Sequence, residues 1–210
     1  MKALILKDFY MALRYCRMFA VIIVVFTICG IGMKNNLFFT IYPCLLASLI
    51  PNTLLSYDER SKWELYASTM PFTRGQLVSV KYIMGLIFQG ATFVLSSIAL
   101  VIRKMVHSDI STVRIIAMLV SLFLIMLMTT AISLPIMFKF GVEKGRIYYY
   151  VIVILFGGGT FGLSALLGDK LETSSISIPP VIIPIILVVP VALYALSWYL
   201  SIVFYKKREF

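Results

Sequence analysis

Charged side chains are scarce in this 210-residue chain, at 13% of the sequence, whereas hydrophobic residues make up 61%. A soluble domain carries about twice that charged fraction, so the composition excludes one. The apolar runs are too long for barrel strands and lack their alternation. They suit helices, which need about 20 residues to cross the hydrocarbon layer. The sequence therefore predicts an all-α integral membrane protein, folded as a single domain over residues 1–210.

Six apolar segments predict six transmembrane helices. The first is short, and the 1–17 segment before it carries Leu4, Phe9 and Leu13 at helical spacing, with Asp8 off that stripe. We expect an amphipathic helix that lies in the membrane interface; the alternative is that it extends the first span into the cytoplasm. The predicted spans lie near residues 18–34, 36–55, 79–102, 115–138, 147–167 and 181–205.

Basic residues fix the expected orientation. With a cytoplasmic N-terminus, the inner flanks of six spans hold 14 of the 19 lysines and arginines. This bias obeys the positive-inside rule, so we expect both termini in the cytoplasm. The net charge of +10 then reflects contact with anionic lipid and requires no nucleic acid.

Chemically active residues are absent from the predicted spans. All nine acidic residues lie outside them, as does the only histidine, His107. An intramembrane metalloprotease needs His and Glu ligands, and ion-coupled carriers usually place a carboxylate or histidine in the membrane. The sequence thus predicts no catalytic, cofactor or metal site. An ion-coupled secondary transporter that uses backbone carbonyls, and a non-transporting assembly or sensor subunit, remain alternatives.

The most polar stretch, residues 56–72, predicts a short folded helix between the second and third spans. Ser56 and Glu59 have the spacing of a capping box, and Asp58 precedes Lys62 at the favourable i,i+4 spacing. Pro71 ends the helix.

The predicted helix has an aromatic face, because Trp63, Tyr66 and Met70 recur at helical spacing. A second capping box, Thr73 with Gln76, opens the third span. The helix is either a docking element for a protein partner or an interfacial helix that rests its aromatic side chains among lipid headgroups.

The stretch DERSKWELYASTMPFTRGQLVSVKY resembles the loop between the second and third spans of type-2 ABC exporter permeases. These proteins show an acidic residue, a Glu within a short helix, a Thr-x-Pro turn followed by Arg, and a Lys that enters the third span. The closest similarity is to small bacterial permeases related to phenol-soluble modulin exporters. The matching positions are Glu59, Glu64, Thr69, Pro71, Thr73, Arg74 and Lys81.

The resemblance implies the type-2 ABC exporter fold in a bacterial plasma membrane, and a permease without its own ATPase site. A separate ATP-binding subunit, in two copies, would bind ATP and Mg, so this chain would hold no cofactor. Residues 56–72 would be the coupling helix, with Trp63, Tyr66 and Met70 as anchors. The full set of coupling residues would be Asp58, Glu59, Arg60, Trp63, Glu64, Tyr66, Met70, Pro71 and Arg74.

The same resemblance implies a second permease chain, identical or a sister, because six spans make a thin pathway. The function expected is export of a hydrophobic or amphipathic substrate, such as a peptide, out of the cell. Aromatic side chains in the spans suit such a cargo, although they could equally face lipid or the protein core. The candidate pathway residues are Phe38, Phe39, Tyr42 and Phe93.

Overall fold

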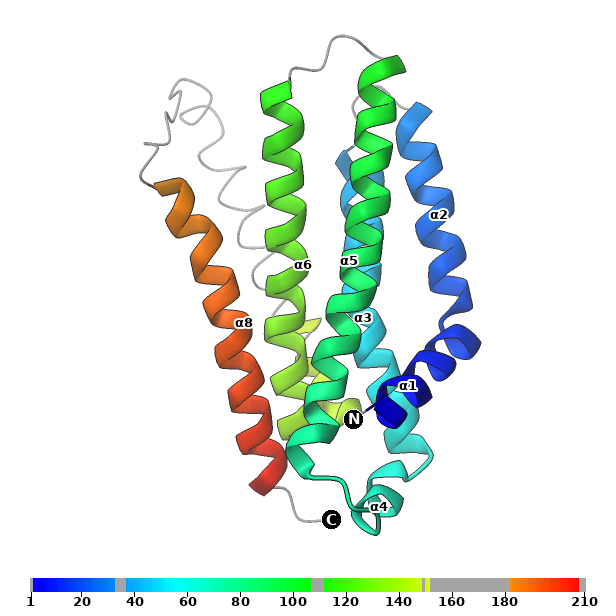
Figure 1. The fold of residues 1–210 in the computed structure, drawn as a ribbon, viewed down its shortest axis with the longest axis vertical. Helices are drawn as coiled ribbons and strands as arrows, with labels where there is room; N and C mark the ends of the chain where they lie inside the picture. Colours follow the sequence, from blue (N-terminus) through cyan, green and yellow to red (C-terminus); the bar gives the residue numbers. More distant parts are fainter. Residues whose placement is uncertain (1, 33–36, 107–111, 149, 152–181, 208–210) are drawn as a thin grey trace.

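The protein is a bundle of long helices in a computed structural model that describes residues 2–32, 37–106, 112–148, 150–151 and 182–207 (Figure 1). Within these ranges the regular secondary structure is helical. The short helix α4 lies at the same end of the bundle as α1 and the last turns of α8. The helices are α1 (Lys2–Tyr15), α2 (Arg17–Gly32), α3 (Leu37–Arg60), α4 (Trp63–Ser68), α5 (Arg74–Val106), α6 (Thr112–Phe140) and α8 (Ile182–Lys207).

Four described helices are long and apolar enough to cross a membrane, and the count rises to five if the bent α1–α2 pair is one span. The all-α membrane class is confirmed, whereas the described residues support fewer than the six spans expected. Most of the expected span at 147–167 lies outside the described residues. The four single-helix candidates are Phe38–Arg60, Arg74–Val106, Ile115–Phe140 and Val188–Lys206.

The chain bends by 67° between α1 and α2. Residues 1–17 therefore do not simply extend the first span as one straight helix; that α1 lies in the membrane interface stays a prediction. One expectation for α1 is wrong. Asp8 lies on its buried face together with Leu4 and Ala12, at i,i+4 spacing, whereas Leu13 is exposed.

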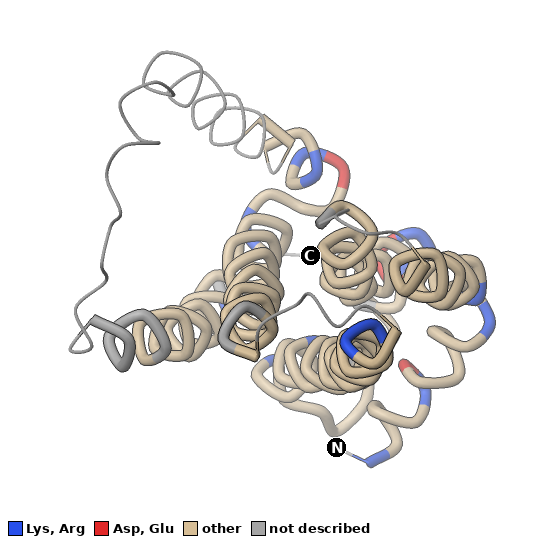
Figure 2. Tube along the Cα trace, turned by 90° about the horizontal axis from the view of Figure 1, so that it is seen from above, with Lys and Arg blue, Asp and Glu red and all other residues tan. Residues whose placement is uncertain are grey.

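Helices α3, α5 and α6 group at the centre of the bundle, with α2 to one side and α8 to the other (Figure 2). Proline occurs inside three of the spanning helices, and the ring of Pro51 packs against α5. A Cβ built at Gly85 would lie only 3.1 Å from the Cγ atom of Pro51. Glycine at this position therefore allows α3 and α5 to approach closely.

Polar side chains join the central helices within the apolar bundle. Gln89 of α5 donates to the hydroxyl of Ser48 at 3.2 Å and to the carbonyl of Met126 at 3.0 Å, and it also contacts Thr130. Nearby, Ser133 of α6 donates to the side-chain oxygen of Asn52 at 3.3 Å. Such bonds lower the cost of burying these polar groups, although Asn52 Nδ2 and Gln89 Oε1 have no partner among the described residues.

A second polar contact connects α5 to α8. The hydroxyl of Tyr82 lies 2.8 Å from that of Ser197 and 2.7 Å from that of Ser201. The ring of Trp198 stacks on Tyr82 with centroids 5.4 Å apart, and its indole N–H donates to Ser79 at 3.0 Å. These contacts hold the C-terminal half of α8 against the first turns of α5.

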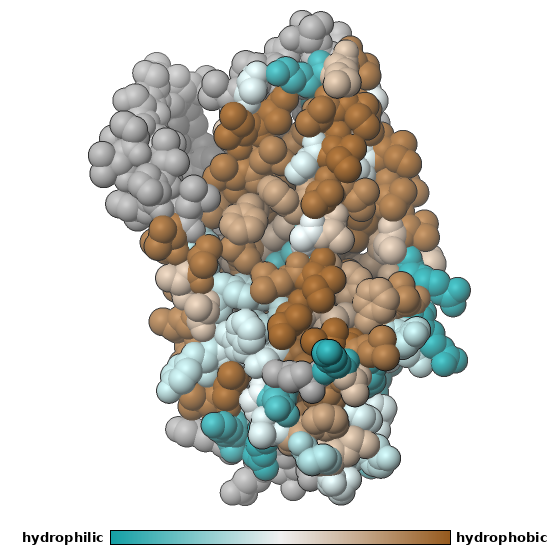
Figure 3. All heavy atoms as spheres, viewed as in Figure 1, coloured by the Kyte–Doolittle hydropathy of each residue, from teal (hydrophilic) through white to brown (hydrophobic). Residues whose placement is uncertain are grey.

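The outer surface matches a membrane environment. Figure 3 shows hydrophobic side chains over the upper and middle part of the bundle, and more hydrophilic ones toward the end that carries α4. Many of the exposed side chains of α2, α5 and α8 are large and apolar. Surfaces of this extent are unusual on soluble proteins and indicate contact with lipid.

Candidate functional site: the junction of α3, α4 and α5

The polar stretch folds differently from the expected capped helix. Helix α3 continues through Ser56 to Arg60, so Ser56 is not an N-cap and the Ser56–Glu59 capping box does not form. The reason is tertiary, because Leu54 and Leu55 are buried in two different core clusters and keep the chain helical. The break comes at Lys62, which adopts the left-handed conformation with φ 52°.

Helix α4 is accordingly shorter than the expected 56–72 segment and begins at Trp63. The hydroxyl of Thr69, two residues before Pro71, donates to the carbonyl of Tyr66 at 2.8 Å. The second capping box is confirmed: the Thr73 amide donates to the Gln76 side chain at 3.1 Å, and the Gln76 amide donates to the Thr73 hydroxyl at 3.3 Å. A defined stop and restart therefore separates α4 from α5.

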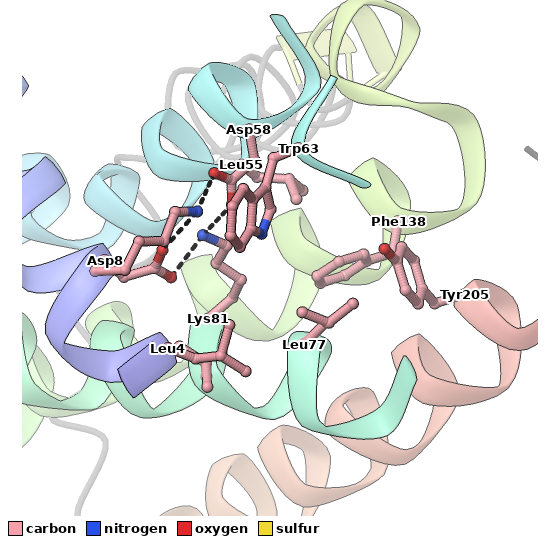
Figure 4. A pocket seen from close by; sticks show the side chains of 11 residues that line it. Leu4, Asp8, Leu55, Asp58, Trp63, Leu77, Lys81, Phe138 and Tyr205 are labelled. Carbon is pink, nitrogen blue, oxygen red and sulfur yellow. Dashed lines mark hydrogen bonds and ion pairs between the residues drawn. The ribbon is translucent and has the colours of Figure 1, made fainter. Parts of the chain in front are cut away.

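Four charged side chains meet behind α4 (Figure 4). Lys81 of α5 is 5% exposed and lies 2.6 Å from the carboxylate of Asp8 in α1 and 2.6 Å from that of Asp58 in α3. Lys7 pairs with the same two carboxylates, at 3.2 Å from Asp8. Two positive and two negative charges thus balance, which buried ions require. We refer to Lys7, Asp8, Asp58 and Lys81 as the charge cluster.

Trp63 closes the charge cluster on the side of α4. Its ring lies 4.3 Å from the Nζ atom of Lys7, a cation–π distance, and it lines the same small cavity of about 20 Å³ as Asp58 and Lys81. The predicted Asp58–Lys62 pair is wrong, since Asp58 turns inward to Lys7 and Lys81. The first residue of α4 is therefore fixed to the base of α1, α3 and α5 at once.

The exposed face of α4 carries Leu65 and Tyr66, which are 52% and 58% exposed. The rings of Trp63 and Tyr66 lie side by side with centroids 5.6 Å apart, as the helical spacing predicts, but Trp63 is half-buried against the charge cluster and only Tyr66 is exposed. Ala67 is buried and sets the inward side of the helix. The outward surface is a small apolar and aromatic patch on a helix whose base is rigidly tied.

Glu59 connects α3 to the chain that follows α6. Its carboxylate accepts from the backbone N–H of Val142 at 2.7 Å, at the start of the helical segment 142–148. Gly141, with φ 80°, makes the turn there. Gly145 allows close packing, because a Cβ at this position would lie 2.9 Å from the Cα atom of Met137. Beside this turn lies a mixed polar cavity of about 300 Å³ that Glu59 lines.

The remaining candidate coupling residues divide between structural contacts and surface. Arg74 donates to the carbonyl of Lys206 at 3.0 Å, which satisfies the end of α8. Arg60 lines the mixed polar cavity beside Glu59, Met70 is half-buried, and Pro71 is exposed in the turn before α5. The side chain of Glu64 lies outside the described residues.

The four candidate pathway residues lie in two separate places. Phe38, Phe39 and Tyr42 of α3 cluster around Phe26 of α2, with centroids 4.8–6.0 Å from that ring. Phe93 instead contacts Phe123 of α6 at 5.9 Å and lines an apolar cavity of about 90 Å³. The residues therefore do not form one continuous aromatic surface within this chain.

Sequence reasoning missed Lys7, Asp8 and Leu65 as parts of this site. The structure also places Asp58 and Glu59 inside a candidate span, contrary to the expectation that every acidic residue lies outside the spans. Asp58 pairs with two lysines, and Glu59 bonds a backbone amide. The signal available in the sequence was the isolated Lys81 at the start of a long apolar helix.

The long apolar helices, and the folded junction at one of their ends, define a multi-pass helical membrane protein. A model of the ABC-2 family transporter proteins matches residues 3–206, and the chain belongs to that family. It is the membrane permease component of an ABC-2 type transporter, a family that lacks an ATPase domain and implies an ATP-binding partner subunit. No curated protein and no solved structure matches the chain.

Proposed function

We propose that this permease is the membrane subunit of an exporter, and that α4 is where the ATP-binding subunit docks. The observation that carries the proposal is the combination of an exposed Leu65–Tyr66 patch with a base fixed by the charge cluster. Aromatic side chains dominate the binding energy of protein interfaces. A rigid base is what a docking helix needs if movement of the partner is to reach the spans.

Force applied to α4 has three direct routes into the bundle. Trp63 contacts Lys7 of α1, Asp58 joins the end of α3 to Lys81, and the short turn over residues 69–73 leads into the capping box that begins α5. Because the cluster joins α1, α3 and α5 through close ion pairs, displacement of α4 moves these helices together. ATP and Mg would bind to the partner subunit, which is present in two copies, and this chain would bind no cofactor.

The proposed cargo is hydrophobic or amphipathic, such as a peptide, moved out of the cell between two permease chains. Support comes from the apolar and aromatic lining available on α2 and α3, where Phe26, Phe38 and Tyr42 contact one another. A cytoplasmic position of both termini is supported by the basic flanks and is compatible with α4 facing a cytoplasmic ATPase.

The test is co-purification of the ATP-binding subunit with variants of the permease. Replacing both Leu65 and Tyr66 by Ala should abolish co-purification and permease-dependent change in ATPase rate, since a truncated interface anchor commonly costs about 2 kcal/mol or more. The matched control is Tyr199→Ala, an exposed tyrosine on α8. If the double variant keeps its ATPase with unchanged activity, α4 does not dock, and the headgroup interpretation of its aromatic side chains replaces ours.

A further inference from the structure

A groove lies at the α1–α2 bend. It has a volume of about 190 Å³ and lies between the bend and α5, with Ile50 of α3 as its floor. On α5 it extends from Phe88 to Leu95, which is roughly 10 Å of helix at 1.5 Å per residue. Its walls include Ala20, Val24, Phe88, Ala91 and Leu95.

The groove is apolar along most of its length, and small side chains form part of its wall. Ala20 and Ala91 are both exposed on the surface of the bundle, and the side chains of Val24 and Leu95 in the same groove are about half exposed. An extended hydrocarbon chain fits such a shape, whereas the volume falls below the roughly 300 Å³ at which pockets for drug-sized ligands begin. Burial of apolar area would supply the binding free energy.

One end of the groove is positively charged. Arg17, the first residue of α2, is exposed and lines the groove. Arg14 is exposed nearly one helical turn earlier. Among the described residues no carboxylate pairs with Arg17, and the nearest acid in α1, Asp8, already binds Lys7 and Lys81. Hydrophilic side chains stand out beside the α1–α2 junction in Figure 3.

We propose that this groove binds one anionic phospholipid, with an acyl chain between α2 and α5 and the phosphate beside Arg17. The acyl chain would lie against the apolar walls, which continue along α2 and α5. The phosphate would lie at the end nearer α1, where Arg17 is found. A second copy of the chain seated here would bury Arg17 away from its solvating environment, which costs free energy unless it brings a carboxylate. The lipid steadies the bend that separates α1 from α2.

Native mass spectrometry of the detergent-purified permease, titrated with phosphatidylglycerol or phosphatidylcholine, measures this binding directly. One phosphatidylglycerol per chain should bind more tightly than phosphatidylcholine. Arg17→Gln should weaken phosphatidylglycerol roughly fivefold and leave phosphatidylcholine unchanged, because one basic residue at an anionic surface contributes about that factor. Ala20→Phe should weaken both lipids, since it fills the groove.

Two matched controls lie outside the groove. Arg146→Gln removes an exposed arginine, and Ala195→Phe enlarges an exposed alanine of α8; neither should change the affinity for either lipid. Inorganic phosphate alone should not displace the bound lipid, because it lacks the acyl chain. Equal affinity of the wild type for the two lipids, or an Arg17→Gln variant that matches Arg146→Gln, would overturn the proposal. Lipid bound only to monomers and excluded from dimers would show that a second copy covers the groove.

Discussion

Removing Asp58 tests whether the charge cluster holds the base of α4. Asp58→Asn removes one of the two negative charges of the charge cluster. Lys7 and Lys81, of which Lys81 is only 5% exposed, must then share the single carboxylate of Asp8. Breaking a buried ion pair by removing one partner costs about 3–5 kcal/mol. For a chain of this size each kcal/mol corresponds to about 2–4 °C in Tm, so we expect a loss on the order of 10 °C.

A double variant separates the charge balance from the loss of contacts. Asp58→Leu with Lys81→Met removes one charge of each sign and leaves Lys7 paired with Asp8. The double variant should therefore be more stable than either single variant, because no uncompensated charge stays buried. Its coupling to the ATP-binding subunit should nevertheless fall, since α3 and α5 lose their direct ionic link.

The assay is thermal unfolding of the purified permease, monitored by size-exclusion chromatography of samples heated to different temperatures. The control variant is Glu143→Gln. Glu143 is an exposed acid near the end of α6, so its variant should change Tm by no more than a degree or two. A Tm for Asp58→Asn equal to that of the control, or a double variant whose loss equals the sum of the two single losses, would refute the charge-balance reasoning.

Three further changes have expected outcomes in the same unfolding assay. Gly145→Ala should cost about 1–3 kcal/mol, because its Cβ would meet the backbone of Met137 at 2.9 Å. Gly32→Ala should be tolerated, since no atom of the described residues lies within 4 Å of the added Cβ. Thr73→Ala should cost about 1 kcal/mol through loss of a helix cap, and Thr73→Ser should restore most of it. Gln89→Leu should cost no more than about 1 kcal/mol of stability, although Gln89 makes three hydrogen bonds. The reason is that the hydroxyls of Ser48 and Thr130, which Gln89 contacts, also bond carbonyls of their own helices. A fall in Tm as large as that of Asp58→Asn would contradict this.

Local patterns in the sequence were sufficient where the structure is determined locally. The capping box at Thr73 and Gln76 forms as predicted, since both partners lie within one turn and compete with no other contact. The apolar runs likewise predict α3, α5, α6 and α8, although α3 extends farther than its apolar run because buried Leu54 and Leu55 hold the next turn in the helix.

The same kind of pattern failed at Ser56 because distant residues decide the outcome there. The Glu59 carboxylate, expected to cap the chain at Ser56, instead bonds the amide of Val142, 83 residues away. Asp8 and Lys81 are 73 residues apart and no spacing rule connects them. Helical periodicity predicts that Trp63 and Tyr66 are neighbours, but the contact of Trp63 with Lys7, which leaves Trp63 half-buried, depends on a residue 56 positions away.

The most direct test of the account is photo-crosslinking from α4 in the working transporter. A photoreactive phenylalanine analogue placed at Tyr66 should crosslink to the ATP-binding subunit, and the same analogue at the exposed Tyr199 of α8 should not. Crosslinks from position 66 to lipid alone, in a complex that hydrolyses ATP, would contradict the claim that α4 is the docking helix.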